Sequence, residues 1–175
     1  MKELKKKNLE NMQNEFTEEE RMELLNYYCI FENNQIDLIE NLLNSKIDLN
    51  KKNSNGFTTL DMVVAYTDQN KEIINFLIQK KSDPNSRNDL NGYTSLFIAC
   101  ISRNIDLEVI SALLNGKADP NLQDKQGITP LYLSCGLHHP LEGVVELLID
   151  KGADPNIKNN LGRKKKISSE KKNFI

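Results

Sequence analysis

The segment Gly127-Ile128-Thr129-Pro130-Leu131, whose glycine lies 27 residues before Asp154, decides the fold because its pattern recurs at a nearly fixed interval. Successive glycines of the pattern are 36, 35 and 35 residues apart, and successive Asp-x-Asn pairs are 35, 36 and 35 residues apart. The glycines are Gly56, Gly92, Gly127 and Gly162, and the aspartates are Asp48, Asp83, Asp119 and Asp154. A period of this length is typical of repeat architectures, in which each unit buries its apolar face by stacking on its neighbours. The extra residue of the middle unit falls between Ser86 and Asn91.

Two apolar stripes with helical spacing follow each of the first three glycines. The threonines Thr58, Thr94 and Thr129 can cap a helix, and Pro130 fits a first helical turn, where its missing N–H is not needed. The first stripe has the i, i+3, i+4 spacing of one buried face and comprises Leu60/Val63/Val64, Leu96/Ala99/Cys100 and Leu131/Ser134/Cys135. The second comprises Ile73/Ile74/Leu77/Ile78, Val109/Ile110/Leu113/Leu114 and Val144/Val145/Leu148/Ile149. We therefore predict two helices per unit, each burying a face against the next unit.

These segments resemble the ankyrin repeat. The resemblance rests on Gly127 to Leu131, on degraded copies at Gly92 to Leu96 and Gly56 to Leu60, and on the ending Ala153-Asp154-Pro155-Asn156. It implies an all-α repeat fold, an ankyrin-type solenoid of stacked helix-turn-helix units joined by β-turn loops. We expect the repeat domain to cover residues 18–162, with repeats at about 18–52, 53–88, 89–123 and 124–158. A charged segment, residues 1–17, precedes this domain, and a basic tail, residues 163–175, follows it.

The two ends of the repeat domain depart from the pattern. Arg21 stands where the first glycine is expected, so we predict an atypical first repeat that acts as an N-terminal cap. At the other end Gly162 begins a fifth unit, but lysines 164–166 occupy the Thr-Pro-Leu positions, which predicts only a turn or a short helix. The units exceed the usual ankyrin length of about 33 residues, and we place the excess between the helices, in Thr67–Asn70, Arg103–Asp106 and Leu137–Leu141. A fragment of a longer array remains an alternative.

Charge and composition narrow the classes of function. The net charge is −2, with +2 in residues 1–12 and +5 in residues 163–175, which leaves −9 for residues 13–162. An acidic body is poorly suited to holding phosphate backbones. The sequence has no apolar run of about 18 residues, so we expect no membrane contact and a cytoplasmic, intracellular protein, with secretion as an effector left open. Three cysteines share one repeat position and should be reduced, buried and unbridged; they are Cys29, Cys100 and Cys135.

Catalytic and cofactor chemistry has little support. The two histidines, His138 and His139, are adjacent in an expected loop and lack the spacing of a metal site. No glycine-rich phosphate loop is present, so we expect no catalytic residue, no metal, no cofactor and no small-molecule substrate. The basic tail is interpreted as a solvated, disordered end. The alternative function is a nucleic-acid-associated or nuclear regulator that acts through this tail.

The resemblance places a partner-binding surface on the concave face, where the turn tips meet the first helices. It assigns to this face Phe57, Tyr93 and Ile128, each directly after a turn glycine, and at the tips Leu90, Asn91, Lys125 and Gln126. Where the family often has a histidine after the leucine, this chain has Asp61, Phe97 and Tyr132, which predicts loss of the usual threonine–histidine contact. We expect a monomer, or weak self-association, that binds a protein partner through these ten residues. In the alternative interpretation Phe57, Tyr93 and Ile128 pack onto neighbouring turns.

Overall fold

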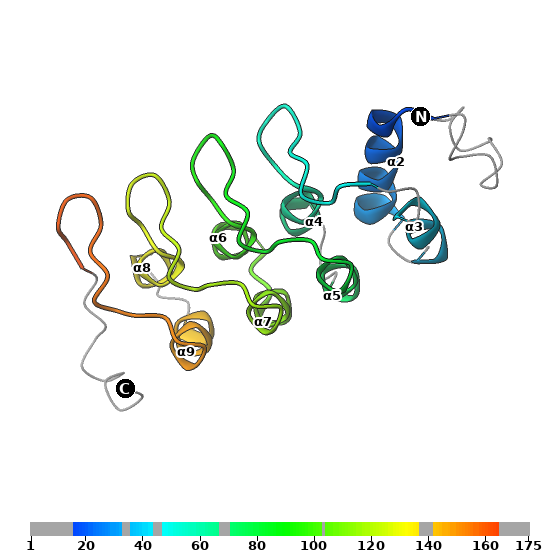
Figure 1. Cartoon of the computed structure of the whole chain (residues 1–175). Coiled ribbons are helices and arrows are strands. Elements are labelled where there is room, and N and C mark those ends of the chain that lie inside the picture. The colour runs from blue at the N-terminus through cyan, green and yellow to red at the C-terminus, as the bar shows by residue number, and fades with distance from the viewer. Residues whose placement is uncertain are drawn as a thin grey trace.

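The computed structural model describes residues 16–32, 36–43, 47–66, 71–102, 104–136 and 142–164. Within these ranges the chain forms eight helices and no strand, and the helices stand as four pairs side by side (Figure 1). The first helices are α2 (Glu18–Phe31), α4 (Thr59–Tyr66), α6 (Ser95–Ile101) and α8 (Pro130–Gly136). The second helices are α3 (Ile36–Leu43), α5 (Lys71–Gln79), α7 (Leu107–Asn115) and α9 (Glu142–Asp150). The predicted all-α ankyrin-type repeat fold is confirmed.

The core is a continuous layer between neighbouring pairs rather than a single globular centre. The predicted stripes supply it, and Leu60, Leu96, Leu113 and Leu148 are almost fully buried. Each such leucine contributes about 1.5–3 kcal/mol of burial free energy. Ser134 takes an apolar position in α8 and is satisfied because its hydroxyl donates to the Pro130 carbonyl at 3.0 Å. The repeats are therefore held together by contact between successive units.

The predicted threonine caps are present at α4, α6 and α8. The hydroxyl oxygen of Thr94 accepts a hydrogen bond from the Phe97 N–H at 3.3 Å. The Thr58 and Thr129 hydroxyls accept in the same way at 3.3 and 3.1 Å. Each threonine satisfies one of the N–H groups that a helix start leaves without a partner.

Four hairpin turns project from the same side of the helix pairs (Figure 1). We call them fingers 1 to 4; they comprise residues 53–57, 88–93, 124–128 and 159–163. In every finger the first residue donates its backbone N–H to the carbonyl of the last residue at 2.9 Å. The glycine before that last residue has a φ between 70° and 78°, which only glycine adopts without strain. The recurring glycines are therefore required by the finger backbone.

Finger 2 carries the extra residue of the middle unit, where the sequence places it. Its glycine, Gly92, donates to a carbonyl four residues back, that of Asn88, at 3.0 Å. In finger 3 the donor is Gly127 and the acceptor, Asp124, lies only three residues back. The longer turn leaves the Leu90 side chain 61% exposed at the tip.

The repeated Asp-x-Asn pairs connect each unit to the next. Asp83 accepts the N–H of Asn85 at 2.9 Å, and the Asn85 side chain then bridges to the following repeat. Its Oδ1 accepts the Asp119 N–H at 2.8 Å, and its Nδ2 donates to the Lys117 carbonyl at 3.0 Å. Asn50 and Asn121 make the same pair of bonds one repeat earlier and one repeat later. These residues have the turn role expected for Asp and Asn, with an additional link between repeats.

The first repeat is atypical, as Arg21 in the glycine position indicates. The 14-residue helix α2 occupies the positions where the later repeats form a finger. A capping box starts it, in which Thr17 accepts from the Glu20 N–H while Glu20 accepts from the Thr17 N–H at 2.8 Å. At the other end Gly162 completes finger 4, and residues 165–175 lie outside the described part. So do Thr67–Asn70, Arg103 and Leu137–Leu141, where we placed most of the excess length.

Candidate functional site

The predicted partner-binding residues lie on the fingers and on the first helices beside them. Phe57, Tyr93 and Ile128 occupy one equivalent position after the finger glycines, and all three are half-buried. Phe57 and Tyr93 also pack against the core, as the alternative interpretation holds. Phe57 and Tyr93 therefore combine a supported base with some accessible surface. The tip residues Leu90, Asn91, Lys125 and Gln126 are all exposed.

Tyr93 lies on a second aromatic ring. Its ring stacks on that of Phe97 with centroids 4.4 Å apart and an interplanar angle of 13°. Phe97 is only 3% exposed, because the Tyr93 ring covers it. Its place in the partner-binding surface stays a prediction. Phe97 fixes the orientation of Tyr93.

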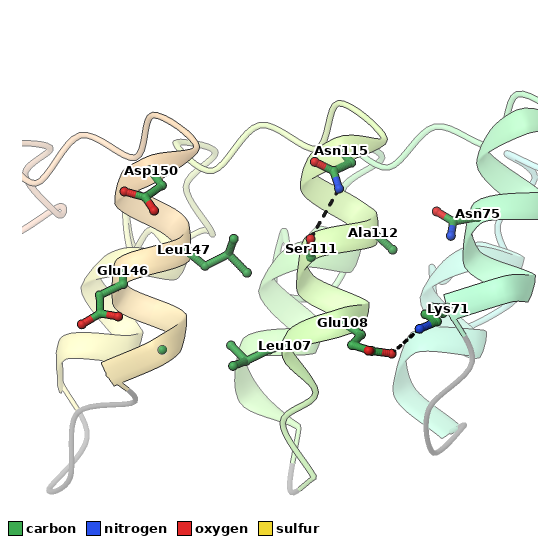
Figure 2. A pocket seen from close by; sticks show the side chains of 11 residues that line it. Lys71, Asn75, Leu107, Glu108, Ser111, Ala112, Asn115, Glu146, Leu147 and Asp150 are labelled. Atoms are coloured by element: carbon green, nitrogen blue, oxygen red, sulfur yellow. Dashed lines mark hydrogen bonds and ion pairs between the residues drawn. The ribbon is translucent and has the colours of Figure 1, made fainter.

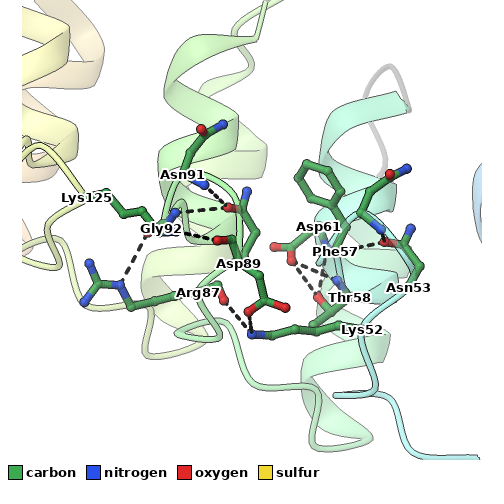
Figure 3. Close-up of polar contacts among 12 residues, drawn as sticks. Lys52, Asn53, Phe57, Thr58, Asp61, Arg87, Asp89, Asn91, Gly92 and Lys125 are labelled. Carbon is green, nitrogen blue, oxygen red and sulfur yellow. Dashed lines mark hydrogen bonds and ion pairs between the residues drawn. The ribbon is translucent and has the colours of Figure 1, made fainter.

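Asp61 is also buried. Its Oδ2 accepts the Thr58 N–H and hydroxyl, both at 3.0 Å (Figure 3). Its Oδ1 accepts the Ser95 hydroxyl of the next repeat at 2.6 Å. Burial raises the pKa of this carboxyl, and the hydrogen bonds from Ser95 and Thr58 and the nearby Lys52 charge only partly oppose that shift. Thr58 therefore bonds an aspartate at the position where the family often has a histidine.

Tyr132, at the repeat position of Phe97, keeps part of its surface. It is half-buried, and its hydroxyl accepts a hydrogen bond from the Asn159 Nδ2 at 3.3 Å. The residue at the Tyr93 position in this repeat is Ile128, so no second aromatic ring is supplied from that position. Tyr132 thus lies partly exposed at the base of fingers 3 and 4.

A ladder of side-chain hydrogen bonds, with one donor residue per repeat, fixes the spacing of the fingers, and the sequence reasoning missed it. Lys52 Nζ donates to the Arg87 carbonyl at 2.7 Å and forms an ion pair with Asp89 at 2.7 Å (Figure 3). The Arg87 guanidinium donates to the Gln123 carbonyl, and Gln123 Nε2 donates to the Lys158 carbonyl at 3.0 Å. The signal was present, because long side chains with N–H donors occupy the same repeat position throughout. This ladder holds the finger bases in a fixed row.

Fingers 2, 3 and 4 are also joined through their backbones. The Lys125 N–H donates to the Asn91 carbonyl at 2.9 Å, and the Asn160 N–H donates to the Gln126 carbonyl at 3.1 Å. Lys125 Nζ adds a bond to the Asp89 carbonyl at 2.5 Å. The candidate surface therefore sits on a row of fingers whose positions are set by direct hydrogen bonds.

The described residues offer few groups for chemistry. No cluster of three or more His, Cys, Asp or Glu side chains that could hold a metal occurs among them. None of the three cysteines forms a disulfide within the described residues, and burial raises the pKa of the Cys29 and Cys100 thiols to about 12. His138 and His139 lie outside the described residues. In that same described part, no helix is long and apolar enough to span a bilayer.

Comparison of the sequence with protein-family models shows the family of this chain. The family model described as ankyrin repeats (3 copies) matches residues 62–159, which is more than half of the chain. The chain belongs to the ankyrin repeat family, as the glycine and Asp-x-Asn patterns predict. Ankyrin repeats generally mediate protein–protein interaction, and the family is typically non-enzymatic. No curated protein matches the chain in a sequence search.

Proposed function

We propose that this protein is a non-enzymatic interaction module that binds a partner protein on the concave face formed by the fingers and the first helices. The observation that carries the proposal is the row of half-buried apolar side chains Phe57, Tyr93 and Ile128, one per finger. Aromatic and large apolar groups supply most of the energy of protein interfaces when they lie in supported, preorganised positions. Tyr93, stacked on buried Phe97, meets that condition best.

The exposed finger tips extend this surface with mixed chemistry. Leu90 adds apolar area, Asn91 and Gln126 add hydrogen-bonding groups, and Lys125 adds one positive charge. The body around them, residues 13–162, has a net charge of −9. That charge favours a basic partner through faster encounter and more specific orientation.

A capture experiment with two matched variants tests the proposal. The finger variant replaces Phe57, Tyr93 and Ile128 by serine in the full chain. The control variant replaces Phe31, Tyr66 and Ile101 by serine; these residues are 69%, 69% and 45% exposed and lie at the C-terminal ends of the first helices. Both variants must retain the wild-type circular dichroism spectrum before use.

The three proteins serve as baits, and captured proteins are identified by mass spectrometry and their affinities then measured with purified partner. We expect a partner bound by the wild type and the control variant and lost by the finger variant. Equal binding by the finger variant would refute the proposed face. Loss in the control variant alone would move the site to the ends of the first helices.

A further inference from the structure

A groove on the opposite side of the molecule from the candidate site runs across the second helices. It is open, has a volume of about 650 Å³, and is lined by residues of α5, α7 and α9. Leu107 and Leu147 point toward each other from α7 and α9 (Figure 2). Gly143, which has no side chain, lies against Leu107: an added Cβ there would be 3.0 Å from a Leu107 methyl carbon. The groove thus combines small residues with two leucine side chains.

The α9 side of this groove carries negative charge that is not neutralised by the described residues. Glu146 and Asp150 line it, and neither forms an ion pair within the described part of the chain. Glu108 differs, because Lys71 pairs with it at 2.5 Å. The cation next in sequence, Lys151, bonds the Asn115 side chain at 2.7 Å instead.

The position of Asp150 at the end of a helix makes its negative charge energetically unfavourable. It is the last residue of α9, whose last turn contains no basic residue. Carbonyl groups at a helix C-terminus carry partial negative charge, so a carboxylate there is unfavourable and a cation is favourable. A positively charged segment beside Asp150 and Glu146 would relieve both effects.

We propose that the chain's own basic tail, residues 165–175, docks along this acidic groove. The tail holds four lysines and one glutamate together with Ile167, Phe174 and Ile175, so it offers both cations and apolar groups. Its lysines pair with Glu146 and Asp150, and its apolar residues cover Leu107 and Leu147. This occupant is distinct from any partner on the fingers.

The starting point and length of the tail fit this placement. Lys164 Nζ donates to the Asn156 side chain at 3.1 Å, in the turn that follows α9. The tail therefore leaves the described part beside the turn that follows α9, in which Asn156 lies six residues after Asp150. Eleven further residues can span about 36 Å, whereas the nine residues of α9 are only about 14 Å long. Attachment in the same chain also supplies a high effective concentration, so weak pairing suffices.

The experiment places a spin label on the tail of the full chain. Asn173→Cys provides the attachment site in a Cys135→Ser background, in which the two remaining cysteines are buried. We expect the methyl signals of Leu107 and Leu147 to lose most of their intensity, while those of Leu25 in the first repeat are unchanged. Since Debye screening shortens to about 3 Å at 1 M salt, the loss should diminish as salt is added.

Charge variants of the same labelled chain decide the interpretation. Glu146→Gln with Asp150→Asn keeps the shape of the groove and should restore the Leu107 and Leu147 signals. The matched control, Glu23→Gln with Asp37→Asn, changes two exposed carboxylates at the far end of the array and should not. No signal loss in the starting protein, or equal loss in both variants, would overturn the proposal. Loss that appears only between labelled and unlabelled molecules would assign the tail to a second copy and overturn docking within one chain.

Discussion

Replacing Asn85 by alanine should loosen the joint between two repeats while leaving the fold intact. The change removes the acceptor for the Asp119 N–H at 2.8 Å and the donor to the Lys117 carbonyl at 3.0 Å. A hydrogen bond contributes about 0.5–1.5 kcal/mol net. Because Asn85 is half-buried and Asp119 is exposed, we take the lower part of that range for each bond and expect a total loss of about 1–2 kcal/mol.

Urea denaturation of the full chain, followed by circular dichroism, measures this loss. With a slope of about 2 kcal/mol/M, the midpoint should fall by about 0.5–1 M. Asn121→Ala should behave alike, because its bonds are 2.7 and 3.0 Å long. Asn50→Ala should cost less, because its donor bond is longer, at 3.4 Å.

Asn156→Ala is the matched control for the inter-repeat bonds. Asn156 has the same place in its turn, but in the described part of the chain its side chain forms hydrogen bonds only with Asp154 and Lys164. Its removal should change stability by no more than about 0.5 kcal/mol. If Asn156→Ala were as destabilising as Asn85→Ala, the effect would belong to the turn itself, and the reasoning about the asparagine bonds between repeats would fail.

Three further predictions concern buried or strained groups. The pKa of Asp61 is raised in the folded protein, so the folded state retains a proton that the unfolded chain releases. The free energy of unfolding of the wild type should therefore fall, relative to that of Asp61→Asn, as pH rises from about 4 toward neutrality. Urea midpoints of both proteins across this range check it. Lys117 has a φ of 71° after α7, so Lys117→Gly should raise the free energy of unfolding by about 1 kcal/mol; a lower urea midpoint would contradict the strain argument. With a thiol reagent at pH 8, Cys135 should react first, and Cys29 and Cys100, whose pKa is raised to about 12, should react only on unfolding, as mass spectrometry with increasing urea would record.

The sequence predicts the parts of this fold that depend on local or repeated interactions. Thr58, Thr94 and Thr129 cap helices because a cap needs only residues three positions apart. The stripes locate the buried faces for the same reason, since helical spacing is local. The extra residue of finger 2 is found by counting between repeats, which needs no coordinates.

Burial differences at one repeat position could not be predicted in this way. Asp61 accepts the hydroxyl of Ser95, which lies 34 residues further along, and this depends on how the next unit stacks. Phe97 is buried whereas Tyr132 is half-buried, because the Tyr93 ring covers Phe97 and an isoleucine occupies the corresponding place before Tyr132. The groove across the second helices likewise depends on the approach of Leu107 to Gly143, which brings two repeats together.

One asparagine of each repeat gives every joint between repeats the same hydrogen bonds. Asn50, Asn85 and Asn121 each present one acceptor and one donor to the following unit, where a backbone N–H donates to the acceptor and a carbonyl accepts from the donor. A whole unit could therefore be duplicated or deleted, and the new neighbours would still find complementary partners. Array length can thus vary by genetic duplication without loss of these asparagine bonds, while the finger side chains diverge independently.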